Sequence, residues 1–181
     1  MKIAGIKGEY DGIFSLGELC YISIQLEKNG IRPYSGVLDW MGSYGLSNVN
    51  RLLRNRFEGF MDRHQIECIG TAGEKLYLVK DKTYDILSNH DFFIAQNDPK
   101  LLEAYPSVKA KYDRRVARFL EKVDTSKRLL LSAAAGHTKK SNNCGKCSTI
   151  SCRMNTFCCL STLVTRMGSR RMTGLWNEFV R

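Results

Sequence analysis

The stretch DGIFSLGELCYISIQLEKNG, residues 11–30, contains the strand–turn–helix pattern on which our prediction of the fold rests. Residues 11–16 form a short, largely apolar run that ends at a glycine, as is typical of a buried strand. Residues 18–28 then place apolar side chains at helical spacing. Gly30 supplies a stop signal, because glycine adopts the left-handed conformation that a helix end requires. We therefore predict a buried strand that is followed directly by a helix.

Further strands and helices are predicted to alternate along the rest of the chain. From apolar periodicity and turn signals we expect a helix that begins near Ser47, a hairpin of residues 66–69 and 76–79, a strand at 84–87, a helix from a Ser107 cap to Val123, and a strand that begins at 128–131. These elements are compatible with α/β or α+β, and their order favours α/β. We predict an α/β domain in which flanking helices cover a small mixed sheet.

The length and composition are those of one globular domain. The chain has 181 residues, of which 43% are hydrophobic and 25% charged, so it can bury a core and is too apolar for disorder. No apolar run approaches the roughly 20 residues of a membrane span, and residues 1–10 lack the apolar core of a signal peptide. We expect a cytoplasmic protein that is not inserted in a membrane and needs no cofactor.

Two totals are unusual, and both arise in the last part of the chain. A formal net charge of +10 and seven cysteines are together typical of a zinc-containing nucleic-acid binder. Residues 1–132, however, contain 20 basic and 17 acidic residues, a net charge of +3. The C-terminal segment, residues 133–181, contains eight basic residues and one acidic residue, a net charge of +7. Five of the seven cysteines also lie in this C-terminal segment.

The C-terminal segment almost lacks the periodicity of helices and strands that a genuine domain should show. This periodicity returns in a shifted reading frame. In that frame each codon consists of the last base of one codon of the given frame and the first two bases of the next. Residues 136–150 could then encode the amphipathic helix TYEEVKQLRKVLND, residues 155–162 the strand YILLLVN, and residues 170–178 EDDWPLER. At three positions the given residues fix all three bases of the shifted codon. These codons encode Glu, Asp and Glu, and each residue fits the restored pattern.

We therefore hypothesise a frameshift close to residues 131–133. On this hypothesis residues 1–132 are the N-terminal part of an incomplete domain that has lost its last helix and strand, and residues 133–181 are a disordered, out-of-frame tail. The alternative is a genuine basic, cysteine-rich extension. The hypothesis predicts that this polypeptide is poorly folded or inactive, even if its full-length relatives are enzymes.

One pair of cysteines in the C-terminal segment has the spacing of zinc ligands. Cys144 and Cys147 resemble half of a zinc knuckle, and the candidate partners are Cys152, Cys158, Cys159 and His137. No second Cys-x2-Cys or histidine pair follows, and two adjacent cysteines are awkward ligands for one tetrahedral site. We therefore predict no metal site. We do not expect nucleic-acid binding either, because the excess charge lies on the same segment.

Cys20 and His90 are the candidate catalytic residues. Cys20 lies in the first turn of the helix predicted at residues 18–28, where the helix dipole lowers a thiol pKa; the alternative is a buried, small apolar residue. A histidine can take the thiol proton and later protonate the leaving group. His64 lies in a polar stretch typical of the surface and His137 in the C-terminal segment. His90, just after a predicted strand, is thus the base candidate by elimination, unless it is a hydrogen-bonded structural residue.

Three further charged residues each have two alternative roles. Asp39 could orient His90, or it could cap the turn before the helix that begins near Ser47. Arg114 and Arg118 are one helical turn apart, so they could bind an acidic group of a substrate or belong to a solvated helix face.

Four motifs occur in order: SLGELC at residues 15–20, YSGVLDW at 34–40, HDF at 90–92 and KYDRRVARFL at 111–120. Over about residues 11–132 they resemble an uncharacterised family described as putative papain-like cysteine peptidases. The restored DDWPLER resembles the C-terminal motif of that family as well. The resemblance implies that Cys20 is the nucleophile and His90 the general base. The third group of a papain-like arrangement is either Asp39 or lies in the VN of the restored strand.

The leading prediction is a cysteine-nucleophile hydrolase or acyltransferase that acts on a peptide or a small acyl substrate. Attack by Cys20, proton transfer by His90 and oxyanion stabilisation by backbone N–H groups at the helix start would serve peptides, esters and thioesters equally. One alternative is a non-catalytic carbohydrate- or protein-binding module of the same fold. A less favoured alternative is a basic protein that binds zinc or nucleic acid.

Overall fold

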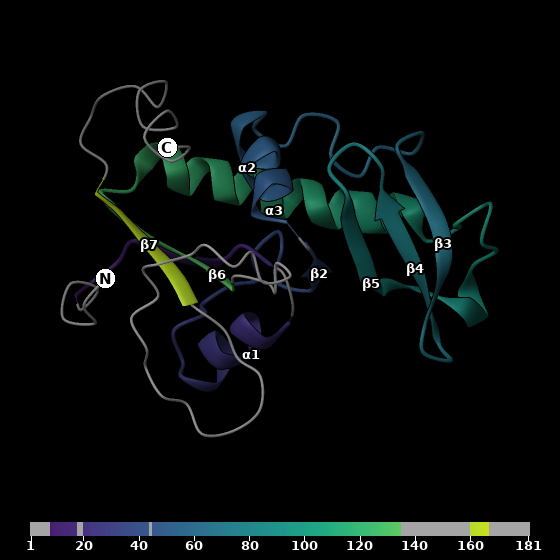
Figure 1. The fold of residues 1–181 in the computed structure, drawn as a ribbon, viewed down its shortest axis with the longest axis horizontal. Coiled ribbons are helices and arrows are strands. Elements are labelled where there is room, and N and C mark those ends of the chain that lie inside the picture. The colour runs from purple at the N-terminus through teal and green to yellow at the C-terminus, as the bar shows by residue number, and fades with distance from the viewer. Residues whose placement is uncertain (1–7, 18–19, 44, 135–159, 167–181) are drawn as a thin grey trace, which may run out of the picture.

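The computed structural model describes residues 8–17, 20–43, 45–134 and 160–166 (Figure 1). In these ranges the elements, in chain order, are β1 (Gly12–Ser15), α1 (Tyr21–Lys28), β2 (Met41–Gly42), α2 (Leu46–Arg54), β3 (Ile66–Ala72), β4 (Leu76–Asp81), β5 (Ile86–Phe93), the short 3-10 helix η2 (Ile94–Gln96), α3 (Tyr105–Thr125), β6 (Arg128–Ala134) and β7 (Leu160–Arg166). The predicted α/β class is confirmed, although the described strands form two sheets rather than one.

The first sheet has the order β1-β6-β7. β1 runs parallel to β6, with Phe14 opposite Leu131, and α1 follows β1 as predicted. β6 pairs with β7 in an antiparallel register. β7 belongs to the C-terminal segment, but all five cysteines of that segment lie outside the described residues. The residues with zinc-like spacing, and most of the segment that the frameshift hypothesis concerns, lie outside the described part of the chain.

The second sheet is antiparallel and has the order β2-β5-β4-β3. The predicted hairpin is confirmed as β3 and β4, which extend beyond the predicted residues. β5 spans Ile86–Phe93 rather than residues 84–87, so His90 lies inside the strand and not after it. The polar residues around His90 concealed this part of the strand, because they interrupt the alternation of apolar and polar side chains.

α3 connects the two sheets, and Figure 1 shows this long helix running beside both of them. In its C-terminal half, Phe119 packs against Phe14 of β1, with ring centroids 4.8 Å apart. In its N-terminal half, Tyr112 packs against Phe60, which precedes β3, at 5.8 Å. All four rings belong to one cluster of buried side chains, so the two sheets share a core.

The start of α3 differs from the predicted cap at Ser107. The helix begins at Tyr105 with Ala104 at the cap position, and the Ser107 hydroxyl donates to the Ala104 carbonyl (2.8 Å). Pro106 explains the earlier start, because the fixed φ of proline suits the first helical turn, where its missing N–H needs no partner. The Ala104 N–H donates to the side-chain oxygen of Asn97.

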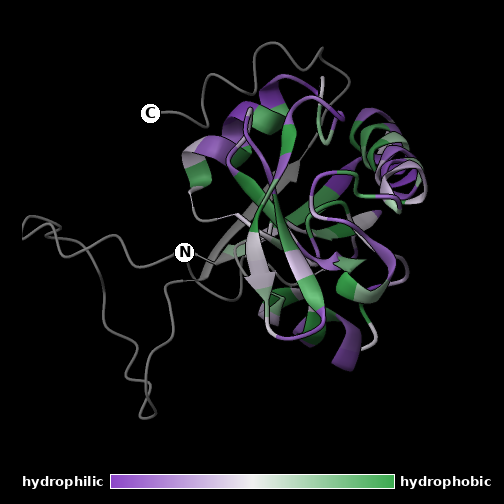
Figure 2. Cartoon of the chain, turned by 90° about the vertical axis from the view of Figure 1, so that its right-hand side faces the viewer, coloured by the Kyte–Doolittle hydropathy of each residue, from purple (hydrophilic) through white to green (hydrophobic). Residues whose placement is uncertain are grey.

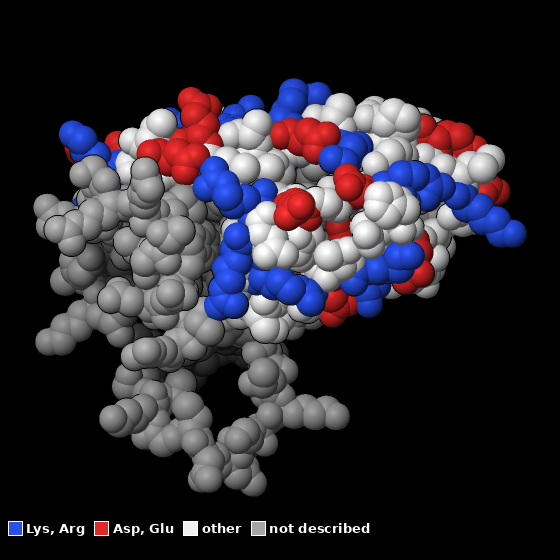
Figure 3. Space-filling view, turned by 90° about the horizontal axis from the view of Figure 1, so that it is seen from above, with Lys and Arg blue, Asp and Glu red and all other residues white. Residues whose placement is uncertain are grey.

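The surface of the described chain is mixed in character. Figure 2 shows that the helices carry alternating hydrophilic and hydrophobic stripes, as expected for elements that cover a core. Figure 3 shows acidic and basic side chains interspersed over one face, in keeping with the near balance of charges in residues 1–132. No helix among the described residues is long and apolar enough to cross a membrane.

Candidate active site

Gly17 lies between the end of β1 and Cys20. Gly17 has a φ of +83°, and a Cβ atom at this residue would lie 2.5 Å from the hydroxyl oxygen of Ser43. Both the left-handed backbone and this close approach therefore require glycine. The Gly17 N–H donates to the Ser15 hydroxyl oxygen (3.2 Å), which ties this glycine to the end of the strand. Cys20 is the N-cap residue of α1.

α1 begins at Tyr21, three residues later than predicted, so Cys20 precedes the first turn rather than lying in it. Among the described residues, no side chain forms a capping hydrogen bond at the start of this helix. The first N–H groups of a helix lack intrahelical acceptors and point toward its N-terminal end, which here is the end that carries Cys20. Backbone donors of this kind can stabilise an oxyanion that forms next to the cysteine.

A bulge in β5 carries His90. Between two regular pairs with β4, residues 89–91 of β5 lie opposite Leu78 alone. Extra residues in one strand redirect the side chains there, and bulges are frequent beside active sites. His90 Nε2 lies 3.2 Å from Cys20 Sγ, although the two residues are 70 positions apart. The fold thus brings the predicted nucleophile and the predicted base together, with the imidazole exposed and the thiol half-buried.

The surroundings of Cys20 favour the neutral thiol. Burial raises the pKa of the Cys20 thiol above its ordinary value, and a backbone hydrogen bond at Cys20 offsets this only in part. The helix dipole alone predicts a lowered pKa for the Cys20 thiol; this prediction is wrong because the loss of water around the sulfur has the larger effect. An imidazole at hydrogen-bond distance can still receive the proton during attack, so the pair fits general-base activation.

An aromatic neighbour supports the His90 ring. The ring centroids of His90 and Trp40 lie 5.6 Å apart with an interplanar angle of 72°, an edge-to-face arrangement. In the part of the chain that the structure describes, Cys20 is the only side chain hydrogen-bonded to this imidazole. The Oδ1 atom of the adjacent Asn89 is buried without a partner there. Packing against Trp40 is therefore the observed restraint on the orientation of the ring.

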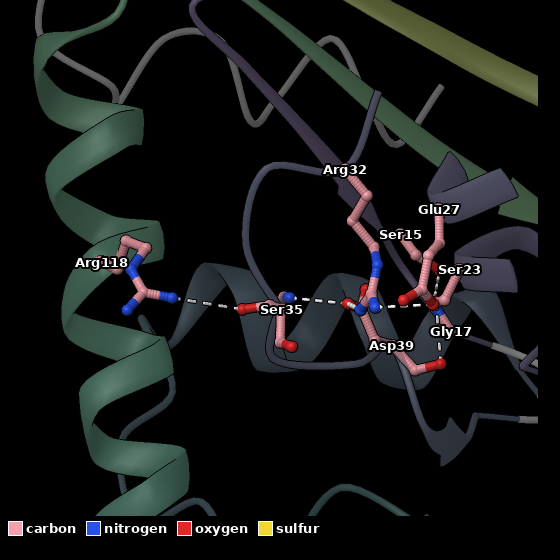
Figure 4. A network of polar contacts seen from close by, with 9 residues as sticks. Ser15, Gly17, Ser23, Glu27, Arg32, Ser35, Asp39 and Arg118 are labelled. Atoms are coloured by element: carbon pink, nitrogen blue, oxygen red, sulfur yellow. Dashed lines mark hydrogen bonds and ion pairs between the residues drawn. The ribbon is translucent and has the colours of Figure 1, made fainter. Parts of the chain in front are cut away.

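Asp39, the predicted third catalytic residue, is directed elsewhere. Its buried carboxylate accepts a hydrogen bond from the Arg32 guanidinium (2.7 Å; Figure 4). It also accepts one from the Gly36 N–H (2.8 Å). Its backbone carbonyl accepts a hydrogen bond from the Ser23 hydroxyl on α1 (2.8 Å). The structure therefore does not bring Asp39 to His90. Asp39 holds the turn at residues 36–39 and joins it to α1.

Asp91, which sequence reasoning did not select, anchors the bulge from the inside. Its carboxylate, 5% exposed, accepts hydrogen bonds from Ser88, from Tyr112 and from Lys111, with which it also forms an ion pair. Burial by itself would raise the pKa of Asp91, but the hydrogen bonds from Lys111, Ser88 and Tyr112 outweigh it and lower the pKa. Both partner motifs, HDF and KYD, are visible in the sequence, but their contact depends on how α3 packs on the sheet.

The two arginines proposed for an acidic substrate group have different surroundings. Arg118 donates to the Ser35 carbonyl (3.5 Å) and lies over the Tyr34 ring, 5.3 Å from its centroid. It therefore ties α3 to the loop that precedes Trp40 (Figure 4). Arg114 is exposed to solvent, which fits the alternative of a solvated helix face.

The remaining candidates for chemistry lie apart from the Cys20–His90 pair. His64 is exposed, as predicted. Cys68 is half-buried in β3, and its thiol lies 3.5 Å from the carbonyl oxygen of Gly70. No group of three or more potential metal ligands occurs among the described residues. The zinc-like pair of Cys144 and Cys147 falls outside them.

Comparisons with known proteins identify a family and one relative. A model of the family described as "Putative papain-like cysteine peptidase (DUF1796)" matches residues 11–144, a range that includes Cys20, Asp39 and His90. An uncharacterized protein of Acanthamoeba polyphaga mimivirus is 28% identical in a 131-residue alignment that covers 64% of this chain. The matched region spans 58% of the viral protein. No solved structure matches the chain.

Proposed function

The chain belongs to the family described as "Putative papain-like cysteine peptidase", and on this premise we propose that it is a cysteine-nucleophile hydrolase. One observation carries the proposal: Cys20 Sγ and His90 Nε2 lie 3.2 Å apart, although they come from different elements. A nucleophile and a base at hydrogen-bond distance are the pairing that covalent catalysis requires. The exposure of the imidazole leaves this pair open to a substrate.

In the first step, the sulfur of Cys20 attacks the carbonyl carbon of the substrate while His90 Nε2 takes the thiol proton. A carbon–sulfur bond forms, and an electron pair of the carbonyl group moves onto the oxygen. N–H groups at the start of α1 stabilise the resulting negative charge. Because the raised thiol pKa keeps the sulfur protonated at rest, proton transfer accompanies the attack rather than preceding it.

In the second step, the tetrahedral intermediate expels the leaving group, which receives the proton from the imidazolium of His90. A thioester on Cys20 remains. Water, deprotonated by His90, then attacks this thioester, the carbon–sulfur bond breaks, and the thiol regains its proton. An amine or an alcohol in place of water would make the same steps an acyl transfer. Peptides, esters and thioesters are therefore all candidate substrates.

An activated ester tests this proposal while the natural substrate is unknown. The protein is mixed with p-nitrophenyl acetate, p-nitrophenolate release is followed, and mass spectrometry locates acetyl groups on cysteines. We expect acetylation of Cys20 that is absent in Cys20→Ser and slowed about 100-fold in His90→Ala. Cys68→Ser is the matched control and should behave like the wild type. Equal acetylation of Cys20 and Cys68 that is unaffected by His90→Ala would overturn the proposal.

A non-catalytic binding module of the same fold is the second candidate function. It is favoured by the raised thiol pKa and by the lack of a hydrogen-bond partner for His90 Nδ1 among the described residues. A module of this kind would show no turnover of p-nitrophenyl acetate beyond that of the Cys20→Ser variant. Ester turnover that depends on both Cys20 and His90 would exclude it.

We also propose that residues 133–181 are translated out of frame and that residues 1–132 carry the catalytic part of the domain. The support is the missing periodicity of the C-terminal segment and the helix and strand that return in the shifted frame. The family match extends to residue 144, so the gene sequence between codons 128 and 144 is the direct test. A single-base insertion or deletion that opens the restored frame would support the proposal. An intact written frame in independent isolates would overturn it.

A further inference from the structure

Arg32 occupies a central position beside the candidate site. Its guanidinium forms ion pairs with Asp39 (2.7 Å) and with Glu27 of α1 (2.9 Å). The carbon at the centre of the guanidinium lies 5.7 Å from the ring centroid of Trp40. The Arg32 side chain is only 10% exposed, and its Nε atom is buried without a partner among the described residues. Figure 4 shows the guanidinium held between the two carboxylates.

A continuous path of contacts leads from Arg32 to the imidazole. Arg32 lies over one ring, Trp40, and Trp40 packs edge-to-face against the second ring, His90, at 5.6 Å. A cation over the face of tryptophan is an attractive contact, and it restrains the ring that it covers. Through Glu27, the same guanidinium is also joined to α1, the helix whose N-cap residue is Cys20. Arg32 therefore connects the nucleophile helix with the ring that supports the base.

We propose that Arg32 is a positioning residue that sets the orientation of the His90 imidazole through Trp40. The inference rests on the proposed function of the Cys20–His90 pair. Since Cys20 is the only described side chain hydrogen-bonded to the imidazole, packing has to hold the ring while the thiol proton is transferred. A substitution away from the reacting atoms that displaces a catalytic group by about 1 Å can lower the rate by up to about 100-fold.

The contacts require arginine rather than a generic positive charge. A planar guanidinium can donate to two carboxylates and stack on an aromatic ring at the same time, whereas a lysine ammonium is a compact point charge. Arg32→Lys therefore retains the charge beside the buried Asp39 but loses the simultaneous contacts with Glu27 and Trp40. This substitution separates the positioning role from the need to neutralise a buried carboxylate.

Two measurements test the proposal in the full-length protein. The first is the rate of Cys20 alkylation by iodoacetamide across pH, which reports the assistance from His90. The second is the NMR chemical shift of the His90 ring protons, which the Trp40 ring current displaces. In Arg32→Lys and Trp40→Leu, we expect the His90-dependent part of the rate at neutral pH to fall about tenfold. We also expect the ring-proton shifts to move toward those of an exposed histidine.

Matched variants keep the test interpretable. Trp40→Phe keeps an aromatic face and should recover most of the rate. Arg56→Lys alters an ion pair with Asp124 whose side chains are 46% and 49% exposed, and it should change neither readout. If Arg32→Lys does not fold, Glu27→Gln replaces it, because Glu27 is 59% exposed and its loss leaves the Asp39 pair intact. Glu27→Gln should lower the rate about two- to threefold.

The possible results distinguish this inference from the proposed function. Unchanged alkylation and unchanged His90 ring shifts in folded Arg32→Lys and Trp40→Leu would overturn the positioning role. A wild-type rate that does not depend on His90 would refute the proposed function. In that case the ring-proton shifts still report whether Arg32 orients the imidazole.

Discussion

Two buried carboxylates hold the two sides of the candidate site, and their partners differ. Asp39, on the Cys20 side, accepts hydrogen bonds from a backbone N–H and from a single guanidinium. Asp91, on the His90 side, accepts hydrogen bonds from three side chains, two of which belong to α3. Asp39 therefore stabilises a local turn, whereas Asp91 couples the bulge to a helix that is distant in the sequence. The His90 side should accordingly be more sensitive to substitution than the Cys20 side.

Substitution of Asp91 should have the largest effect on stability. Asp91→Ala removes the acceptor for Ser88, Lys111 and Tyr112 at once, and it leaves the buried Tyr112 hydroxyl and the half-buried Lys111 ammonium without their carboxylate. We expect a loss of about 3–5 kcal/mol in the free energy of unfolding, measured by urea denaturation. The control Asp113→Ala alters an ion pair on the surface of α3, where Asp113 is 58% exposed, and should cost less than about 1 kcal/mol. Equal losses for the two variants would contradict the comparison.

Substitution of Asp39 should have a smaller effect. The amide oxygen of Asp39→Asn can still accept the Gly36 N–H, so the main loss is the pair with Arg32. We expect the free energy of unfolding to fall by about 2 kcal/mol. The shape of the pH profile for Cys20 alkylation should stay that of the wild type. A folded Asp39→Asn protein that has lost the assistance of His90 would instead favour Asp39 as the third catalytic residue.

Gly17, before Cys20, provides the next smaller effect. Gly17→Ala places a Cβ atom 2.5 Å from the Ser43 hydroxyl oxygen in a backbone with a φ of +83°. We expect a loss of about 1–2 kcal/mol in thermal or urea unfolding. Gly30→Ala is a matched control, because its φ is +67° but no atom lies within 4 Å of the added Cβ. An equal cost at both residues would show that steric contact with Ser43 contributes nothing.

The pH dependence of stability gives the smallest and most specific effect. Burial alone would raise the pKa of Asp91, but its hydrogen bonds outweigh this, so the pKa in the folded state lies below the unfolded value of about 3.9. A carboxylate whose pKa is lower in the folded state stabilises the fold fully at pH values above its unfolded-state pKa. This stabilisation is lost as the pH falls through the folded-state pKa. The stability difference between the wild type and Asp91→Asn should therefore be constant from about pH 7 to 5 and shrink below about pH 4. A difference that grows in acid would contradict the lowered pKa.

The sequence predicted the parts of the fold that depend on local patterns. The apolar run and the stop signal gave the strand–turn–helix around Cys20, and apolar spacing gave the hairpin and the long helix. Errors occurred where one residue changes local backbone geometry, as Pro106 does at the start of α3. They also occurred at the β5 bulge around His90, because a bulge breaks the alternation on which strand prediction depends.

The candidate site was also predicted only in part, because local sequence patterns do not specify contacts between distant elements. Cys20 and His90 could be selected from residue type and position, and the fold brings them together. The contacts of Asp39 with Arg32, and those of Asp91 with Lys111, could not be selected. These contacts depend on how separate elements pack, and the periodicity of the sequence does not predict that packing. Trp40 was part of a recognised motif, but its contact with the imidazole emerged only from the fold.

The most direct test of the central claim is the pH–rate profile for alkylation of Cys20 by iodoacetamide, resolved from the other cysteines by mass spectrometry. If His90 is the base for Cys20, the wild type should react at pH values well below the raised pKa of the Cys20 thiol. His90→Ala should then react appreciably only at alkaline pH, above the ordinary thiol pKa of about 8.5. Superimposable profiles for the wild type and His90→Ala would show that the two side chains are neighbours without being a catalytic pair.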